Sequence, residues 1–207
     1  MPVDAARLPT PGSVLDYWVG PATHDHLAAN RLHKRWFIKR ADTDAFIDRQ
    51  FGPLLGVLSE GLAMEWAAAG PRQRLAAIIV LDQFSRNMFR GTPAAFQYDA
   101  QALKLCLEGL DREEHTALTE VEQSFLFLPL EHSENPIHQD LCVAHFEALV
   151  SRARPAFRPL CERSLDYAHQ HREIIRRFGR FPHRNPILGR TNTAEEDKYL
   201  SRPGAGF

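Results

Sequence analysis

Residues 71–91, PRQRLAAIIVLDQFSRNMFRG, form the stretch that decides the fold. Its middle, AAIIVL, is apolar on every side of a helix, and one apolar face continues to Phe84. A helix that is apolar all round is typical of the interior of a domain, where other helices cover each side. We therefore predict a central helix, buried on several sides, against which the other helices pack.

Charged residues enter this helix near its end. Asp82, Arg86 and Arg90 recur at a spacing of four and would line one face. Asp82 and Arg86 could form an ion pair, and both arginines would complement the negative end of the helix dipole. Directly afterwards, Thr92 and Pro93 have the pattern of an N-cap and first-turn proline of another helix. A helix N-terminus beside two arginines would attract an anion, so this junction is a candidate anion site.

Helical patterns recur along nearly all of the remaining chain. Apolar residues return every three or four positions, and no segment shows the sustained alternation of a β-strand. We predict an all-α fold built from antiparallel helical hairpins, with residues 1–12 as a loose leader and residues 13–207 as a single all-helical domain. Besides the central helix, helices are expected over about residues 13–19, 24–40, 42–60, 93–109, 119–128, 136–150, 155–178 and 193–200.

Glycine, proline and capping residues predict where these helices begin and end. Pro53 lies inside an apolar pattern, and because a mid-helix proline loses a hydrogen bond, we expect a kink or break near Gly52. Pro129 should likewise end its helix. The other predicted boundaries are an N-cap at Ser13, stops at Gly61, Gly109 and Gly179, starts at Pro71 and Pro155, and capping boxes at Thr119 with Glu122 and at Thr193 with Glu196.

The composition argues against several classes of protein. A chain of 207 residues with 44% hydrophobic residues and a formal net charge of -1 is an ordinary globular domain, so we expect neither nucleic-acid nor membrane binding. The three cysteines are widely spaced, which suggests neither a disulfide framework nor a metal site. No phosphate-binding loop, nucleophile elbow or HExxH motif is present, so we expect no cofactor and no metal. The expected location is the cytoplasm.

The main candidate for function is the basic stretch of residues 171–190, HREIIRRFGRFPHRNPILGR. It holds six arginines and two histidines against one acid, Glu173. This local excess implies an anionic ligand, buried acids from elsewhere in the fold, or open solvent. A second candidate is EHSE, residues 131–134, where His132 and Glu134 could act in proton transfer or hydrogen bonding, or could only cap a helix and face solvent.

These motifs resemble those of a known family. The strings VLDYWVG, RWFIKRADTDAFIDRQF, LDQFSRNMFRGTPAAFQYD, FLPLEHSE and HREIIRRFGRFPHRNPILGRTNTAEEDKYL are similar, in this order, to the bacterial family called domain of unknown function 924. The resemblance covers about residues 13–200. It implies a fold similar to the tetratricopeptide-like superhelices, without their usual repeat, and it implies no activity. Glu131 stands where the family commonly has an apolar residue, which argues against a functional role for its carboxyl group.

Three hypotheses assign roles to these residues. In the first, a pocket binds an anionic small molecule, either a carboxylate or a phosphate, and can carry out acid/base chemistry on it. Arginine suits this task because its planar group donates two parallel hydrogen bonds to such an anion. The predicted binding residues are Asp82, Arg86, Arg90, Arg180, Arg184, Asn185 and Arg190, and the predicted acid/base residues are His132, Glu134, His171 and His183.

The second hypothesis is a scaffold whose groove binds an acidic peptide or protein, and it predicts that Phe181 is exposed. The third is a structural lock, in which the arginines pair with acids of the chain and hold the C-terminal loop against the other helices. The acids predicted for the lock are Asp82, Glu134, Glu195 and Glu196. Convergence of Arg86, His132 and Arg184 on one cavity would favour the first hypothesis.

Overall fold

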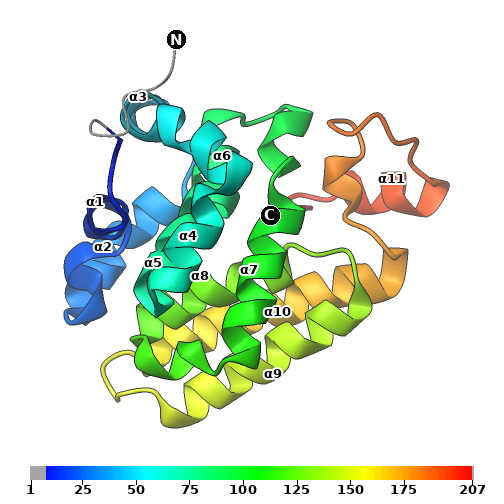
Figure 1. Cartoon of the computed structure of the whole chain (residues 1–207). Helices are drawn as coiled ribbons and strands as arrows, with labels where there is room; N and C mark the ends of the chain where they lie inside the picture. The colour runs from blue at the N-terminus through cyan, green and yellow to red at the C-terminus, as the bar shows by residue number, and fades with distance from the viewer. Residues whose placement is uncertain (1–7, 207) are drawn as a thin grey trace.

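The structure is a computed structural model that describes residues 8–206. Within this range the regular elements are helices, and no strand is present (Figure 1). The predicted all-α fold is confirmed. The α-helices are α1 (Pro11–Trp18), α2 (His26–Phe37), α3 (Ala41–Val57), α4 (Ala63–Ala69), α5 (Pro71–Ile78), α6 (Ser85–Met88), α7 (Asp99–Asp111), α8 (Glu120–Glu131), α9 (Pro136–Arg152), α10 (Arg158–Phe178) and α11 (Ala194–Leu200). Short 3₁₀ turns cover Gly20–Thr23, Pro93–Phe96, Glu114–Ala117 and Pro182–Arg184, and π-helical segments cover Leu58–Leu62 and Ile79–Phe84.

The helices pack as a bundle with α5 near its centre. α5 contacts α1, α4, α7 and α8, while α9 packs against both α8 and α10. Figure 1 shows α9 and α10 running side by side along one edge of the molecule, and α11 standing at one end beside the turn of Pro182–Arg184. Consecutive helices joined by short loops, such as α8 with α9, form the expected hairpins. The tetratricopeptide-like superhelical arrangement stays a prediction.

The central helix is buried as predicted. α5, the π-helical segment Ile79–Phe84 and α6 form one continuous helical run, and every residue from Arg74 to Ser85 in it is buried. In a π-helical segment the backbone hydrogen bonds span five residues instead of four, and such segments are found frequently at functional sites. This segment contains Asp82 and Gln83, so the irregular turn falls where polar groups enter the core.

Two prolines lie inside their helices: the end predicted at Pro129 is wrong, and of the kink or break predicted near Gly52 the break does not occur. α3 continues through Pro53. The preceding residue, Gly52, has no Cβ to clash with the proline ring, which removes part of the cost of a helical proline. α8 continues through Pro129 to Glu131, and the backbone pattern resumes with the His132 N–H donating to the Leu128 carbonyl at 2.9 Å. All the residues of this last turn are buried, so packing outweighs the lost hydrogen bond.

Several predicted boundaries shift. The N-cap of α1 is Thr10, whose side chain accepts a hydrogen bond from the Ser13 N–H, so Ser13 itself lies inside the helix. The predicted leader of residues 1–12 therefore overlaps α1, and its residues 1–7 lie outside the described part of the chain. α10 begins at Arg158 rather than at Pro155. The single helix predicted over residues 93–109 is divided into the 3₁₀ turn Pro93–Phe96 and α7.

Other boundaries are confirmed. Gly61 interrupts the helix between α3 and α4 with φ 143°, and Gly179 ends α10 in the left-handed region with φ 69°. Such backbone conformations favour glycine because it lacks a Cβ. The starts and capping boxes that are confirmed are Pro71 for α5, Thr119 with Glu122 for α8, and Thr193 with Glu196 for α11.

Gly109 was predicted to end a helix, but it lies inside α7 and is buried. A Cβ at this position would lie 2.8 Å from Cδ of Arg74. Arg74 is 1% exposed, and its Nε donates to Glu114 Oε2 at 2.7 Å, so the side chain has little freedom to move. The glycine therefore provides room for a buried arginine rather than a helix stop.

Replacing Gly109 with alanine is expected to destabilise the protein by about 1–3 kcal/mol, because the added methyl group displaces Arg74 from its partners. The matched control is Gly56→Ala in α3, where no atom lies within 4 Å of the added Cβ. That change should stabilise the protein by about 0.5–1 kcal/mol through helix propensity. Urea denaturation measures both, and a Gly109→Ala variant as stable as the native protein would contradict the tight contact.

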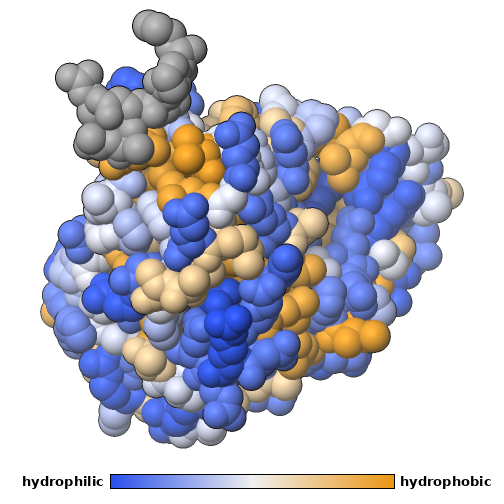
Figure 2. All heavy atoms as spheres, viewed as in Figure 1, coloured by the Kyte–Doolittle hydropathy of each residue, from blue (hydrophilic) through white to orange (hydrophobic). Residues whose placement is uncertain are grey.

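Hydrophilic residues predominate on the face seen in Figure 2, and hydrophobic residues lie there in separate patches. No described helix is both long and apolar enough to span a membrane. The three cysteines, Cys106, Cys142 and Cys161, are buried and free. They pack as small apolar side chains.

Candidate functional site

A cavity of about 660 Å³ lies among α2, α8, α10 and the loops that follow α6 and α10. It brings together motifs that are far apart in the sequence. The predicted site residues that line it are Arg86, Arg90, His132, His171, His183 and Arg184. The convergence of Arg86, His132 and Arg184 is the arrangement that the pocket hypothesis requires.

The Asp82 carboxylate, 1% exposed, lies behind this wall. Its Oδ1 is 2.7 Å from His132 Nδ1 and 3.1 Å from Arg86 Nη1, and its Oδ2 accepts a hydrogen bond from Gln83 Nε2 at 2.6 Å. Burial opposes ionisation of Asp82, but Arg86 and His132 together lower its pKa. Burial and Arg86 lower the pKa of His132, so its ring is neutral at pH 7. The neutral ring donates from Nδ1 to Asp82, which leaves Nε2 as a proton acceptor.

Two guanidinium groups share the carboxylate of Asp99 at the start of α7. Arg86 binds it through both terminal nitrogens at 2.9 Å each, and Arg184 Nη1 lies 3.5 Å from its Oδ2. Arg86 also donates to the Asp82 carbonyl at 2.7 Å. A two-point pair with good geometry fixes Arg86, whereas the single longer contact leaves most of the hydrogen-bonding capacity of Arg184 unused among the described residues.

Arg184 is 7% exposed, which is unusual for an arginine. Its guanidinium lies over the rings of Phe96 and Phe181, 4.7 Å from each centroid. Its Nε is buried and has no hydrogen-bond partner among the described residues. Burial and the nearby Arg86 lower the pKa of Arg184 to about 10, so the group keeps its charge at pH 7.

A carboxyl group and two imidazoles add further polar groups to the wall. Glu131 is 5% exposed, and burial together with Asp82 raises its pKa to about 8. His171 Nδ1 lies 2.9 Å from the Tyr167 carbonyl and 3.5 Å from Glu131 Oε1, and burial lowers the His171 pKa to about 3. Burial also lowers the pKa of His183 to about 4. At pH 7 the wall therefore presents a protonated acid beside neutral histidines.

The remaining predicted residues of the C-terminal loop form ion pairs that hold the loop in place. Glu134 accepts hydrogen bonds from Arg190 at 2.8 and 3.0 Å and from the Phe181 N–H at 2.8 Å. Arg180 binds Glu196 at 2.7 and 2.8 Å. These contacts are those of the lock hypothesis. Neither Glu134 nor either of these arginines lines the cavity.

Three further observations bear on the hypotheses. Arg90, at the cavity wall, binds both carboxylate oxygens of Asp44 at 2.8 and 2.9 Å. Asn185 is fully buried and donates to Asn192 at 2.7 Å, away from the wall. Phe181 is 0% exposed, so the exposure predicted for it by the scaffold hypothesis is wrong. Its ring packs into the loop because its own N–H and carbonyl are held by the Glu134 and Arg190 pair.

The anion site predicted at Thr92 and Pro93 does not form as expected. The helix that begins there is a single 3₁₀ turn of four residues. The Thr92 hydroxyl donates to the Phe89 carbonyl at 2.8 Å and makes no cap for the turn. One short turn carries little dipole, so the arginines rather than a helix end supply the positive charge near the cavity.

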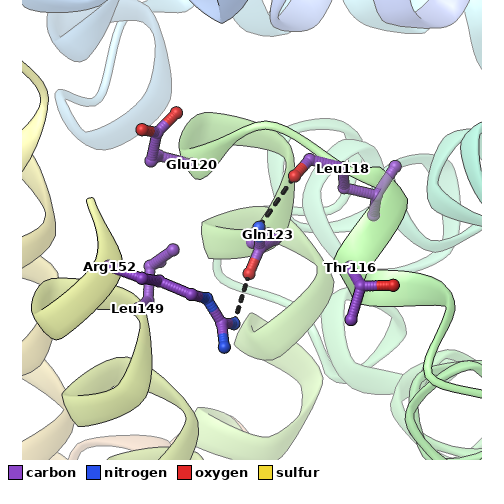
Figure 3. A pocket seen from close by; sticks show the side chains of 6 residues that line it. All are labelled: Thr116, Leu118, Glu120, Gln123, Leu149 and Arg152. Atoms are coloured by element: carbon purple, nitrogen blue, oxygen red, sulfur yellow. Dashed lines mark hydrogen bonds between the residues drawn. The ribbon is translucent and has the colours of Figure 1, made fainter. Parts of the chain in front are cut away.

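A second, smaller cavity lies at the other end of α8. It measures about 250 Å³ and is drawn in Figure 3 with its lining residues, Thr116, Leu118, Glu120, Gln123, Leu149 and Arg152. Arg152 donates to the Gln123 side chain at 2.8 Å, and Gln123 donates to the Leu118 carbonyl at 2.7 Å, as the dashed lines show. The polar groups of Arg152 and Gln123 are therefore engaged in hydrogen bonds within the protein. The larger cavity is therefore the candidate site.

Sequence reasoning missed three residues of the site. Asp99 and Phe96 were assigned to one long helix, and the extra turn that brings both against Arg184 has no clear signal in the sequence. Glu131 was set aside because the family commonly has an apolar residue there, yet its carboxyl group lines the cavity. Among the described residues, no group of three or more histidine, cysteine, aspartate or glutamate side chains is placed to hold a metal ion.

The fold and the cavity define an all-helical domain with arginines and histidines gathered at one internal site. The chain belongs to the family described as "Bacterial protein of unknown function (DUF924)", which it matches over residues 14–204. A solved structure with the same fold is that of ATU0120, a protein of unknown function from Agrobacterium tumefaciens. The two share 31% sequence identity with a TM-score of 0.75, over 92% of this chain and 96% of that chain. Comparison with curated proteins finds no match.

Proposed function

We propose that the 660 Å³ cavity binds a small anionic molecule through Arg184 and Arg86, with His132 as the group that exchanges a proton with it. The observation on which the proposal rests is that the Arg184 guanidinium is buried with few hydrogen-bond partners among the described residues. A charged guanidinium that is 7% exposed, with a buried and unpaired Nε and one contact at 3.5 Å, is under-satisfied among the described residues. A buried cation of this kind is stabilised by an anion that accepts its free hydrogen bonds.

The distribution of charge around the cavity supports an anion rather than a cation. Four arginines reach the wall, Arg86, Arg90, Arg163 and Arg184. Among the described residues that line it, Glu131 is the carboxyl side chain, and its raised pKa of about 8 keeps it mainly protonated at pH 7. Asp82 and Asp99 orient the guanidinium groups from behind. The lock contacts account for Arg180, for Arg190 and, through Asp82, for Arg86, but they do not involve Arg184.

The Asp82–His132 pair gives the proposed site its acid/base capacity. An aspartate that holds one ring nitrogen of a histidine fixes the tautomer and directs the other nitrogen at the substrate. Since the pKa of His132 is lowered, its Nε2 accepts a proton at neutral pH, and Arg86 beside the same aspartate disfavours a second positive charge. The reaction class that suits this geometry is removal or relay of a proton on a bound carboxylate or phosphate compound.

Inorganic phosphate and propionate are suitable first probes, with affinity measured by isothermal titration calorimetry. We expect both to bind, and we expect Arg184→Gln to weaken binding at least about tenfold, since a hydrogen bond to a charged group contributes roughly 1.5–3 kcal/mol. The matched control is Arg112→Gln, because Arg112 is exposed at the end of α7 and does not line the cavity.

Urea denaturation of both variants separates a loss of binding from a loss of folding. Under the lock hypothesis, binding by Arg184→Gln would fall only as far as its folded fraction falls. Failure of both probes to bind the native protein, or unchanged affinity in folded Arg184→Gln, would overturn the proposal.

A further inference from the structure

We propose that the natural occupant of this cavity is an amphipathic anion, with its charged head at Arg86 and Arg184 and an apolar acyl or aryl body along the wall formed by α2, α8, α9 and α10. This inference rests on the proposed function and specifies its ligand class. The apolar wall consists of Trp36, Phe37, Val121, Phe125, Leu128, Phe146 and Leu160.

The aromatic side chains of this wall are arranged as a continuous apolar surface. Phe125 meets the edge of Trp36 at a centroid distance of 5.1 Å, and its ring is parallel to that of Phe37 within 7° at 6.4 Å. The indole N–H of Trp36 donates to the Trp18 carbonyl at 2.8 Å, so the polar atom of the ring is directed into the core. The wall therefore presents aromatic carbon atoms, rather than hydrogen-bonding groups, to a ligand.

The hydroxyl groups on the same side of the cavity are also satisfied internally. Ser124 donates to the Glu120 carbonyl at 2.9 Å within α8, and Ser164 donates to the Leu160 carbonyl at 3.3 Å within α10. Both serines line the cavity. His33 and Arg163 also line the cavity on this side, but Arg163 is exposed, so the buried polar group with capacity for a ligand, Arg184, lies apart from the apolar wall. Such segregation matches a molecule with one charged end and one apolar end.

The dimensions and the exposure of the rim favour the same kind of ligand. A volume of about 660 Å³ falls in the range of pockets that enclose drug-sized organic molecules, and it greatly exceeds what a phosphate or acetate ion fills. At the rim, Phe37 is 57% exposed and Tyr167 is 49% exposed. Exposed aromatic rings at the mouth of a cavity gain stability when an apolar ligand covers them.

A series of straight-chain carboxylates tests the inference: acetate, butyrate, hexanoate and octanoate, each titrated into the native protein by calorimetry. We expect affinity to rise about fourfold for each added methylene until the wall is covered, because burial of one methylene contributes about 0.8 kcal/mol. Quenching of tryptophan fluorescence should accompany binding of the longer chains, since Trp36 lines the cavity. Octanol, which has the same chain without the charge, should bind at least about tenfold more weakly than octanoate.

Phe37→Ser tests the wall itself without disturbing the core, because this ring is more than half exposed. We expect the variant to bind octanoate about threefold to tenfold more weakly and acetate as the native protein does. Its matched control is Ile38→Ser, since Ile38 is 50% exposed at the next position and does not line the cavity. That variant should bind both ligands as the native protein does.

The outcomes separate the inference from the proposed function. Equal affinity for acetate and octanoate would overturn the amphipathic ligand while leaving an anion site at Arg184. Octanol binding as tightly as octanoate, with no effect of Arg184→Gln on octanoate, would overturn the anion site and leave only an apolar cavity. Octanoate affinity that falls equally in Phe37→Ser and Ile38→Ser would overturn the placement of the chain along α2.

Discussion

Replacing Glu131 with glutamine is expected to stabilise the protein increasingly as the pH rises from about 4.5 to about 8. In the folded protein, burial and Asp82 raise the pKa of Glu131 from its ordinary value of 4.5 to about 8. Between these two pH values the folded protein holds a proton that the unfolded chain has lost. The contribution of Glu131 to stability therefore falls as the pH rises through this window. Glutamine keeps the shape of the protonated carboxyl group and has no proton to lose.

The expected change in the free energy of unfolding follows from a value of about 1.4 kcal/mol for each unit by which the pKa differs between the folded and the unfolded state. Between pH 6 and pH 8, the free energy of unfolding of Glu131→Gln should gain about 2 kcal/mol relative to the native protein. Urea denaturation at both pH values measures this difference. Glu147→Gln, at an exposed position of α9, is the matched control and should show no such gain. A Glu131→Gln difference that does not change with pH would mean that the carboxyl group is ionised in the folded protein.

Replacing His171 with glutamine is expected to protect the protein against acid. Burial lowers the pKa of His171 from 6.5 to about 3. Below pH 6.5 the unfolded chain takes up a proton that the folded protein does not, so native stability falls as the pH decreases toward 3. His183, with a pKa lowered to about 4, and His132, with a lowered pKa, act in the same direction. His115 and His145, which lie outside the cavity, also have lowered pKa values, so the cavity wall is expected to supply part of the acid sensitivity of the protein.

Between pH 7 and pH 5, the native protein should lose about 2 kcal/mol more stability than His171→Gln. The variant keeps some acid sensitivity because His132 and His183, whose pKa values are also lowered, remain. His24→Gln is the matched control, since His24 is exposed and outside the cavity, and it should lose as much as the native protein. Equal losses in the native protein and His171→Gln would show that His171 is protonated in the folded state at pH 5.

The fold was largely predictable because its main determinants are local. The apolar middle of residues 71–91 predicted a buried central helix, and the Thr119 and Thr193 capping boxes predicted the starts of α8 and α11. The errors arose where tertiary contacts decide. Pro129 remains inside α8 because packing on all sides outweighs one lost hydrogen bond, and Gly109 is small because Arg74 lies against it. Neither contact can be inferred from spacing along the chain.

The candidate site was predictable in its charged groups but not in its apolar wall. Arg86, His132 and Arg184 occur in motifs rich in polar residues, and polar residues inside helical patterns indicate a site before the fold is known. The division of the arginines could not be predicted, because only the fold shows that Arg190 faces Glu134 while Arg184 faces the cavity. Trp36 and Phe125 had the spacing of ordinary core residues, and a helical pattern does not tell a core face from a ligand-facing one.

Because of the π-helical segment Ile79–Phe84, the direction of the side chains that follow it depends on the number of residues in this turn as well as on their types. Each residue added to or removed from a helix turns everything beyond it by about 100°. Asp82 lies within the segment and Arg86 just after it, so their direction toward His132 and Asp99 depends on the number of residues that precede them. Two related sequences whose lengths differ by one residue in this segment would direct different side chains at the cavity, even if all their other residues were identical. An insertion or deletion in this turn would therefore change which side chains are directed at the cavity.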